Sequence, residues 1–496
     1  MFKSALIETL KTFSREDIKD FGLFVQSPFY NTNQSVIKLF EQIKKLYPEF
    51  EESQTEKKLL FERSFGNIRY NDSFLRMTVF RLMELAKEFL IQRNLQRNNL
   101  MKEILLLDEL SFRELKNLMM KSVKGLDKKI AKQKLKEAET YFAKFKLEYY
   151  KNEDKARDTK MITYKDVLVK DLMLEQESLN IFFFISSLKF FQYYLNQKNY
   201  VVNTGGYPDF MKDIMDFLKQ NIDYLNVPVL KVYYFIVLMF TTKDDKYFFE
   251  LKKILFENKD DISYSEKFNL ITTLRNYAQF KYNNGNEDFK TDMIELLKFS
   301  IGMNILTPAQ NGKYISEMRF MNIVWTGIRS NELDWLEKFI KKFIDRIEPD
   351  KKIYVLAYGT ACIEFERGNF NKALEILGKS GPVKNVYYKA AIKQLTLMIY
   401  YELQWFVPAA DLLDAYRHFI RKDKLLPEIH STYINSFIDY FNRLIKLNDK
   451  PDDNAFEISE LLSELKSTSL TWLMKKAQEL KLISYKLNST QTGKKI

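Results

Sequence analysis

Apolar residues recur at the spacing of an α-helix along nearly the whole chain, and few helix-breaking residues interrupt them. One such stripe steps by four, three, four and three positions: Leu75, Val79, Leu82, Ala86 and Phe89. This spacing places its members on one side of a helix, for which Asp72 or Ser73 is the expected N-cap. The 496 residues include only 14 glycines and 10 prolines, which turns require and helix interiors exclude. The sequence therefore predicts an all-α fold.

Short connections separate the expected helices, so neighbours in sequence are predicted to pack antiparallel. In the second half of the chain we expect helices near residues 207–222, 228–242, 244–257, 263–283, 286–302, 314–329, 332–347, 352–367, 370–379, 386–403, 407–421, 428–446, 454–465 and 468–483. We divide the chain into an N-terminal helical module (1–100), a connecting region of long helices (101–202), an array of helix pairs (203–484) and a flexible basic tail (485–496).

Two segments of this array can be superimposed at a spacing of 36 residues, namely residues 360–377 and 396–413. In this register, apolar and small residues coincide: Phe365 with Tyr401, Phe370 with Phe406, Ala373 with Ala409, and Leu377 with Leu413. A helix pair of this kind cannot bury its apolar face alone, and repeated pairs therefore stack on one another. The spacing predicts an α-solenoid, a stack of antiparallel helix pairs.

Single residues within the repeat match specific positions of a helix pair. Gly368 is expected to end a helix with a positive φ, and Asn369 is expected to cap the next helix. Ala373 is small enough for two helices to cross closely. Pro408 falls in the first turn of its helix, where the missing N–H has no cost.

At these residues the chain resembles tetratricopeptide (TPR)-like repeats, most clearly over 352–421. More widely it is similar to a family of uncharacterised bacterial helical-repeat proteins, in segments 24–43, 70–90 and 399–426. The resemblance implies a concave surface, lined by the first helix of each pair, that binds a protein or peptide. Some TPR proteins hold a carboxylate with a Lys/Asn/Arg clamp. Here the corresponding residues are Tyr358, Cys362 and Leu395, so the clamp is absent.

Residues that could carry chemistry are few and scattered. The two histidines, His418 and His430, lie on different expected helices without a cysteine or a second histidine at ligand spacing. Cys362, the single cysteine, is expected to be a small buried side chain, since no local histidine would activate it. No phosphate-binding glycine motif or nucleophile motif is present. We therefore expect a non-catalytic protein without a cofactor or a metal ion.

The charge of the chain leaves two alternatives open. The net charge is +12, mostly from lysine, which indicates either an ordinary solvated surface or a partner rich in phosphate. The densest lysine cluster would form a positive band about 24 Å long if it were one helix. Its members are the candidate partner-binding residues Lys121, Lys124, Lys128, Lys129, Lys132 and Lys136.

The expected location and function follow from these absences. The N-terminal residues have no apolar core typical of a secretion signal, and the apolar run of residues 232–240 is too short to cross a membrane. We therefore expect a cytoplasmic protein that does not bind membranes. Its expected function is that of a scaffold or adaptor for a protein or peptide. The alternative function is a nucleic-acid-associated helical-repeat protein that uses the lysine-rich surface.

Overall fold

All regular structure in the described part of the chain is helical. The computed structural model describes residues 5–51, 53–66, 68–133, 136–157, 165–200, 206, 208–310, 312–423, 426–449, 454–466, 468 and 470–492. The all-α prediction is confirmed. None of the described helices has the length and apolar character that crossing a membrane requires.

The chain divides into two compact units, which differ from the sequence-based domains in their boundary. The N-terminal unit holds residues 1–133 and 139–180, and the C-terminal unit holds 134–138 and 181–496. The division falls inside the long helix α9 (Lys165–Tyr200), not near residue 202. The first half of α9 contacts α8 (Ala138–Arg157), where Asn152 Nδ2 donates to the Glu175 carboxylate at 2.8 Å. The second half contacts another core through an ion pair of Lys189 with Glu266.

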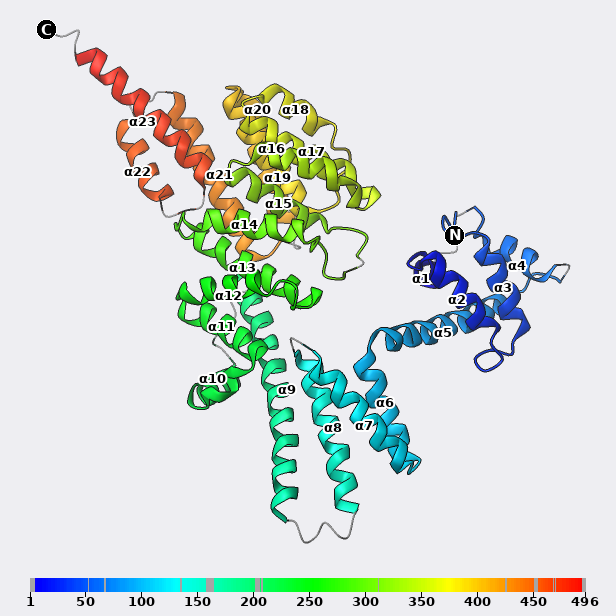
Figure 1. Ribbon diagram of the computed structural model, residues 1–496. Helices are drawn as coiled ribbons and strands as arrows, with labels where there is room; N and C mark the ends of the chain where they lie inside the picture. Colours follow the sequence, from blue (N-terminus) through cyan, green and yellow to red (C-terminus); the bar gives the residue numbers. More distant parts are fainter. Residues whose placement is uncertain are drawn as a thin grey trace. The chain divides into compact units, whose positions relative to one another are not determined.

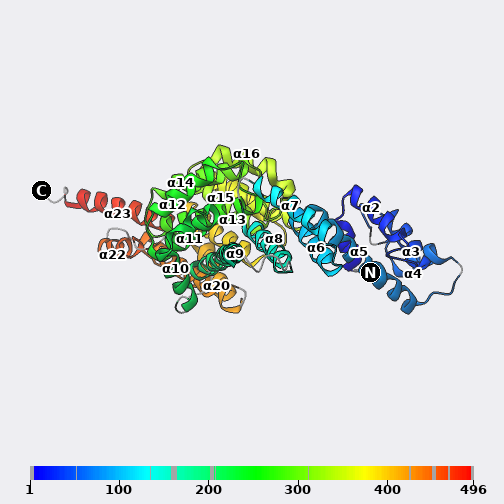
Figure 2. The same cartoon turned by 60° about the horizontal axis from the view of Figure 1, so that its bottom comes forward.

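In the N-terminal unit, four helices pack against the long helix α5 (Asp72–Arg97). They are α1 (Ala5–Lys11), α2 (Arg15–Gln26), α3 (Gln34–Lys44) and α4 (Lys57–Phe65), drawn in blue in Figure 2. Leu75, Leu82, Ala86 and Phe89 of the predicted stripe are buried in this core. The N-cap of α5 is Asn71, one residue before Asp72 and two before Ser73, because the Asn71 side chain accepts a hydrogen bond from the Phe74 amide at 3.0 Å. Helices α6 (Asn99–Phe112), α7 (Lys116–Ala131) and α8 follow.

The C-terminal unit contains the helices expected from residue 207 onward, with starts that differ from the expected ones by up to three residues. They are α10 (Asp209–Gln220), α11 (Pro228–Thr242), α12 (Lys246–Glu257), α13 (Tyr264–Asn283), α14 (Phe289–Gly302), α15 (Glu317–Arg329), α16 (Leu333–Phe343), α17 (Pro349–Glu366), α18 (Phe370–Gly378), α19 (Val386–Glu402), α20 (Phe406–Lys422), α21 (Glu428–Asp449), α22 (Ala455–Leu465) and α23 (Thr471–Thr492). Two short 3-10 helices cover Ile222–Asn226 and Ile344–Arg346. Helix α23 extends nine residues beyond the predicted end, into the segment expected to be a flexible tail.

Sequential helices of the C-terminal unit pack as neighbouring pairs, and α17 also contacts both α15 and α19 (Figure 1). Each pair from α11–α12 to α19–α20 is joined at a residue with positive φ. These residues are Lys243 (58°), Gly285 (90°), Asn331 (56°), Gly368 (79°) and Gln404 (58°). The predicted positive φ of Gly368 is therefore confirmed.

The same hydrogen bond closes four of these turns, from the amide after the positive-φ residue to the carbonyl five residues earlier. The donor and acceptor residues are Asn286 and Lys281 (3.0 Å), Glu332 and Gly327 (2.9 Å), Asn369 and Glu364 (2.9 Å), and Trp405 and Tyr400 (2.8 Å). This bond satisfies carbonyl groups that the end of a helix leaves open.

The prediction that Asn369 caps α18 through its side chain is wrong. Asn369 stands at the N-cap position but makes no side-chain cap. Its side-chain amide (Nδ2) instead donates to the Glu364 carboxylate at 2.8 Å. Glu364 is buried, and a buried carboxylate without hydrogen bonds costs more free energy than a first turn of α18 without a side-chain cap.

The expected packing inside the pairs is present. The rings of Phe365 and Phe370 lie 5.5 Å apart, and those of Tyr401 and Phe406 lie 5.9 Å apart. Ala373 and the matching Ala409 are fully buried. These contacts fix the first helix of each pair against the second, and so define which side of the first helix faces away from the core.

Candidate functional site

A pocket of about 530 Å³ opens on the C-terminal unit, and most of its wall is formed by α21 and by four helices that each begin a pair. The wall helices are α13, α15, α17, α19 and α21, with single additions from α20 and from the connection before α21 (Figure 1). We call this feature the concave pocket. Its volume is in the range of pockets that enclose small ligands or several peptide side chains.

Aromatic and aliphatic side chains make up most of the lining of the concave pocket, and the aromatic ones come from every wall helix. The aromatic residues are Phe280, Trp325, Tyr358, Phe365, Tyr387, Tyr416 and Tyr433. Among the described residues that line it there is no lysine, although lysine and arginine together number 78 in the chain. Three amide side chains, those of Asn283, Asn284 and Gln394, add hydrogen-bonding groups that can donate and accept. The pocket is therefore apolar and aromatic, with neutral polar groups at intervals.

Hydrogen bonds fix the aromatic wall from behind. Trp325 Nε1 donates to the Tyr358 hydroxyl at 2.8 Å. Tyr358 is buried against Tyr388, with ring centroids 5.5 Å apart, and burial raises the pKa of Tyr358 well above its usual value. Tyr388 is fully buried and donates to the Glu317 carbonyl at 3.0 Å. The Trp325 ring is thus held in place by a second layer of packed, neutral tyrosines.

The lining includes one cation and one carboxylate. The guanidinium carbon of Arg329 lies 5.7 Å from the centroid of the Tyr282 ring, a distance at which cations are attracted to aromatic faces. Glu366 is accessible to solvent, but protein atoms around its carboxyl displace part of the water and raise its pKa. The negative charge of Glu402 raises this pKa further, and the positive charge of Lys475 opposes the change. A raised pKa indicates that this part of the pocket disfavours the negatively charged form of Glu366.

We expect the stability of the C-terminal unit to depend on pH through Glu366. Its unfolded-state pKa is near 4.5 and its folded-state pKa is higher, so above pH 4.5 the folded state binds more protons than the unfolded state. Stability contributed by this group is therefore lost as pH rises through the folded-state pKa. Because the carboxyl is accessible to solvent, the effect is small, with a change in melting temperature of about 1 °C.

Melting curves of Glu366→Gln and the unsubstituted protein between pH 4.5 and 7.5 measure this effect. The difference between the two melting temperatures is expected to move in favour of Glu366→Gln as pH rises. Glu375→Gln is the matched control, because the hydrogen bond to Lys379 lowers the pKa of that exposed carboxyl. Its melting temperature, relative to that of the unsubstituted protein, is therefore expected to fall as pH rises. Parallel curves for all three proteins would contradict the prediction.

Cys362 and His430 also line the concave pocket. The predicted burial of Cys362 is confirmed, and burial raises the pKa of its thiol to about 12, so it is not a thiolate at neutral pH. His430 packs edge-on against Tyr387, with ring centroids 5.2 Å apart. Among the described residues no group of three or more histidine, cysteine or acidic side chains could hold a metal ion.

The lysine cluster of the sequence lies far along the chain from the concave pocket and is split by the end of a helix. The members on α7 or directly after it are exposed: Lys121, Lys124, Lys128, Lys129 and Lys132. Helix α7 ends at Ala131, and Lys136 lies in the connection to α8, so a continuous helical band about 24 Å long is wrong.

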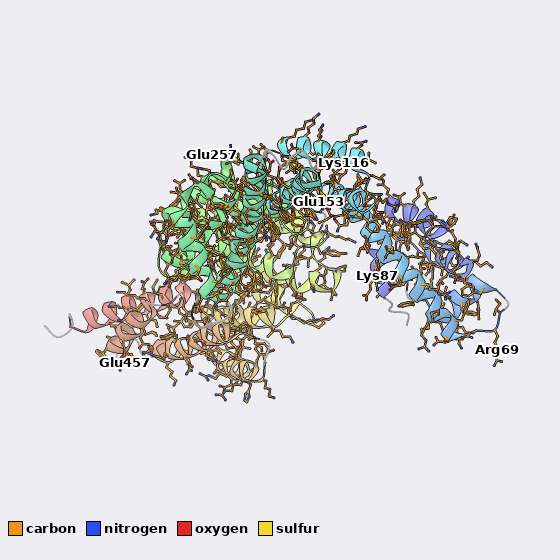
Figure 3. The ribbon with its side chains drawn as sticks, turned by 90° about the horizontal axis from the view of Figure 1, so that it is seen from below. Arg69, Lys87, Lys116, Glu153, Glu257 and Glu457 are labelled. Atoms are coloured by element: carbon orange, nitrogen blue, oxygen red, sulfur yellow. The ribbon has the colours of Figure 1, made fainter. Side chains whose placement is uncertain are left out.

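Acidic side chains pair with one member of this cluster and with another lysine at the start of α7. Lys129 forms an ion pair with Glu103 of α6, and Lys116 at the start of α7 lies 2.9 Å from the Asp154 carboxylate. Figure 3 shows Lys116 and Glu153 of α8 near each other, where both line a small cavity. Binding of nucleic acid by the lysine cluster stays a prediction.

Comparison of the chain with protein-family models, with curated proteins and with solved structures gives no match. The resemblance to TPR-like proteins therefore stays a prediction from the sequence.

Three residues that line the concave pocket, Tyr358, Cys362 and Leu395, stand where the TPR resemblance places the carboxylate clamp, but the other lining residues were not singled out as a binding surface from the sequence. The sequence shows many aromatic residues at helical spacing, most of which are buried between helices. Trp325 and Tyr387 are partly exposed and Tyr433 is 39% exposed, and this separates them from the core aromatics. One sequence feature could have distinguished the pocket aromatics from the core aromatics. Most of them lie in the first helix of a pair, on the side that does not face the second helix.

Proposed function

We propose that the helix pairs of residues 203–484 form a TPR-like α-solenoid, and that the protein is a cytoplasmic, non-catalytic scaffold or adaptor. A peptide segment of a partner protein binds in the concave pocket. Three observations support the solenoid. The same turn recurs between the helices of successive pairs, α17 contacts both α15 and α19, and the first helices of four successive pairs share one pocket wall with α21.

The composition of the pocket lining carries the proposal of a peptide ligand. Tyrosine and tryptophan rings give large contact areas at a low cost in side-chain entropy and dominate binding energies at protein interfaces. Amide side chains such as Asn283, Asn284 and Gln394 bond to both the N–H and the carbonyl groups of a peptide backbone. Nucleic acid would need several cations to neutralise phosphates, and the lining has Arg329 alone among its described residues.

Selection from a random peptide library displayed on phage tests the proposal. We expect the unsubstituted protein to enrich peptides with aromatic or aliphatic residues, binding with dissociation constants in the micromolar range. In Ala391→Trp a large ring fills the pocket from the α19 wall, and we expect these peptides to bind at least about tenfold more weakly, a loss of about 1.4 kcal/mol.

Ala415→Trp is the matched control, because it makes the same substitution at an exposed position of α20 that does not line the pocket. Its affinity for the selected peptides is expected to equal that of the unsubstituted protein. A library that yields no enriched peptides, or peptides that bind Ala391→Trp equally well, would overturn the proposed function.

A further inference from the structure

The last residues of four successive first helices occupy the same position in their helix pairs. Each lies two residues before the positive-φ residue that joins the pair: Asn283 of α13, Arg329 of α15, Glu366 of α17 and Glu402 of α19. The first three of these residues line the concave pocket. The C-terminal end of a helix carries partial negative charge, so it favours a cation and disfavours an acid. Arg329 agrees with this preference, whereas Glu366 and Glu402 do not.

The protein neutralises one of these two acids and leaves the other without a partner. The Glu402 carboxylate accepts a hydrogen bond from Lys476 Nζ at 2.9 Å and another from Trp472 Nε1 at 3.1 Å. Glu366, in contrast, has neither a hydrogen bond nor an ion pair with any residue that the structure describes. The acid inside the pocket is therefore the one whose charge is not compensated.

Other charged groups near the pocket do not supply the missing partner. Arg329, the one cation among the described lining residues, lies against the ring of Tyr282 on α13, with its guanidinium carbon 5.7 Å from the ring centroid. Burial and the charge of Glu402 raise the pKa of Glu366, and the opposing effect of Lys475 does not restore the usual value. A cation brought by a ligand would remove this electrostatic cost.

The lining beside Glu366 suits the stem of a cationic side chain. Tyr358, Cys362 and Phe365 share with Glu366 the side of α17 that lines the pocket. Lysine and arginine have apolar stems that pack on such a surface while the charged head stays in contact with water or with an acid. Aromatic faces also attract cations. A basic side chain can thus place its stem on the α17 wall and its head at the carboxylate.

We propose that Glu366 binds a cationic group, the ammonium of lysine or the guanidinium of arginine, carried by the peptide that the concave pocket holds. The inference rests on the proposed function for the identity of the carrier. It assigns to this protein a preference for peptides that combine apolar side chains with one basic residue. This preference is opposite in charge to that of the TPR carboxylate clamp, whose positions are occupied here by Tyr358, Cys362 and Leu395.

Thermal unfolding of the full chain with two probes of similar shape tests the cation site without any peptide. The probes are phenethylammonium, which has an aromatic ring and an ammonium group, and 2-phenylethanol, its neutral counterpart, at equal ionic strength. Near ten times its dissociation constant, phenethylammonium is expected to raise the melting temperature by about 2 °C, and 2-phenylethanol by less. In Glu366→Gln the two probes are expected to have equal effects.

Two further variants separate the charge of Glu366 from its place in the fold. Glu366→Lys reverses the charge, and we expect it to respond to phenylpropionate instead of phenethylammonium. Glu375→Gln is the control, because it makes the same substitution at a carboxylate of α18 that bonds to Lys379 and does not line the pocket. It is expected to keep the full difference between the probes. Equal effects of the two probes on the unsubstituted protein, or the same difference in Glu366→Gln, would overturn the inference.

The peptides selected from the library give a second measurement. We expect lysine or arginine at a fixed position among their apolar residues, and which of the two is enriched identifies the cationic group. Their affinity for Glu366→Gln is expected to be about tenfold lower than for the unsubstituted protein. Added salt is expected to weaken binding to the unsubstituted protein more than binding to Glu366→Gln, because salt screens the ion pair.

The two proposals fail in distinguishable ways. A response to phenethylammonium that depends on Glu366, together with a peptide library that gives no binders, contradicts the proposed function and leaves the cation site in place. Selected peptides that bind Glu366→Gln as tightly as the unsubstituted protein, without a difference between the two probes, contradict the cation site alone.

Discussion

Replacement of Tyr388 with alanine is expected to lower the free energy of unfolding of the C-terminal unit by about 4 kcal/mol. Tyr388 is fully buried, and its ring contacts those of Tyr354 and Tyr358 at centroid distances of 5.1 and 5.5 Å. Alanine leaves a cavity among these rings and removes the donor to the Glu317 carbonyl. Both effects act at the point where α15, α17 and α19 meet.

Tyr388→Phe separates the two contributions, because it keeps the ring and removes only the hydroxyl. We expect a loss of about 1 kcal/mol for this variant. Tyr433→Ala, at a position 39% exposed, is the control and should cost less than Tyr388→Ala by several-fold. If Tyr388→Ala cost no more than Tyr433→Ala, the packing described here for α19 would be incorrect.

Tryptophan fluorescence during urea unfolding measures these differences for the C-terminal unit alone. All four tryptophans of the chain lie in that unit: Trp325, Trp335, Trp405 and Trp472. A parallel measurement by far-ultraviolet circular dichroism reports both units, so a difference between the two transitions shows whether they unfold together.

Replacement of Trp325 with alanine is expected to weaken binding of the selected peptides by about 30-fold, or about 2 kcal/mol. The Trp325 ring is partly exposed in the pocket wall, and its hydrogen bond to Tyr358 keeps it in one orientation. A rigid aromatic side chain in this situation loses little entropy when a ligand covers it. Isothermal titration calorimetry with the peptides from the library measures the change.

Trp335 offers the matched control for this substitution. It lies on α16, the second helix of the same pair, stacks on Phe339 and does not line the concave pocket. Trp335→Ala is expected to leave the peptide affinity unchanged while lowering stability about as much as Trp325→Ala. Equal losses of affinity in the two variants would indicate a general effect on the fold instead of a contact with the peptide.

The sequence predicted the helices of the C-terminal unit well, for reasons visible in single residues. Gly368 adopts the positive φ that glycine favours, and Pro408 lies in the first turn of α20. Prediction was weaker where a side chain has more than one available hydrogen-bond partner. The side-chain amide of Asn369, for example, donates to the Glu364 carboxylate instead of capping α18. It also missed that α9 belongs to two cores, because periodicity within one helix does not show where its neighbours change.

The concave pocket could not be predicted in the same way. Helix α17 packs against α18 of its own pair and also against α15 and α19, so more than one of its sides is apolar. Which aromatics remain accessible, such as Trp325 and Tyr433, depends on the angle between successive pairs.

The construction of the pocket wall has a mechanical consequence. The wall helices come from several neighbouring helix pairs, so a small rotation at the contact of α17 with α15 or with α19 changes the width of the opening. The width then depends on contacts between pairs that touch no ligand. Substitutions in such contacts are expected to change the affinity for a ligand at a distance.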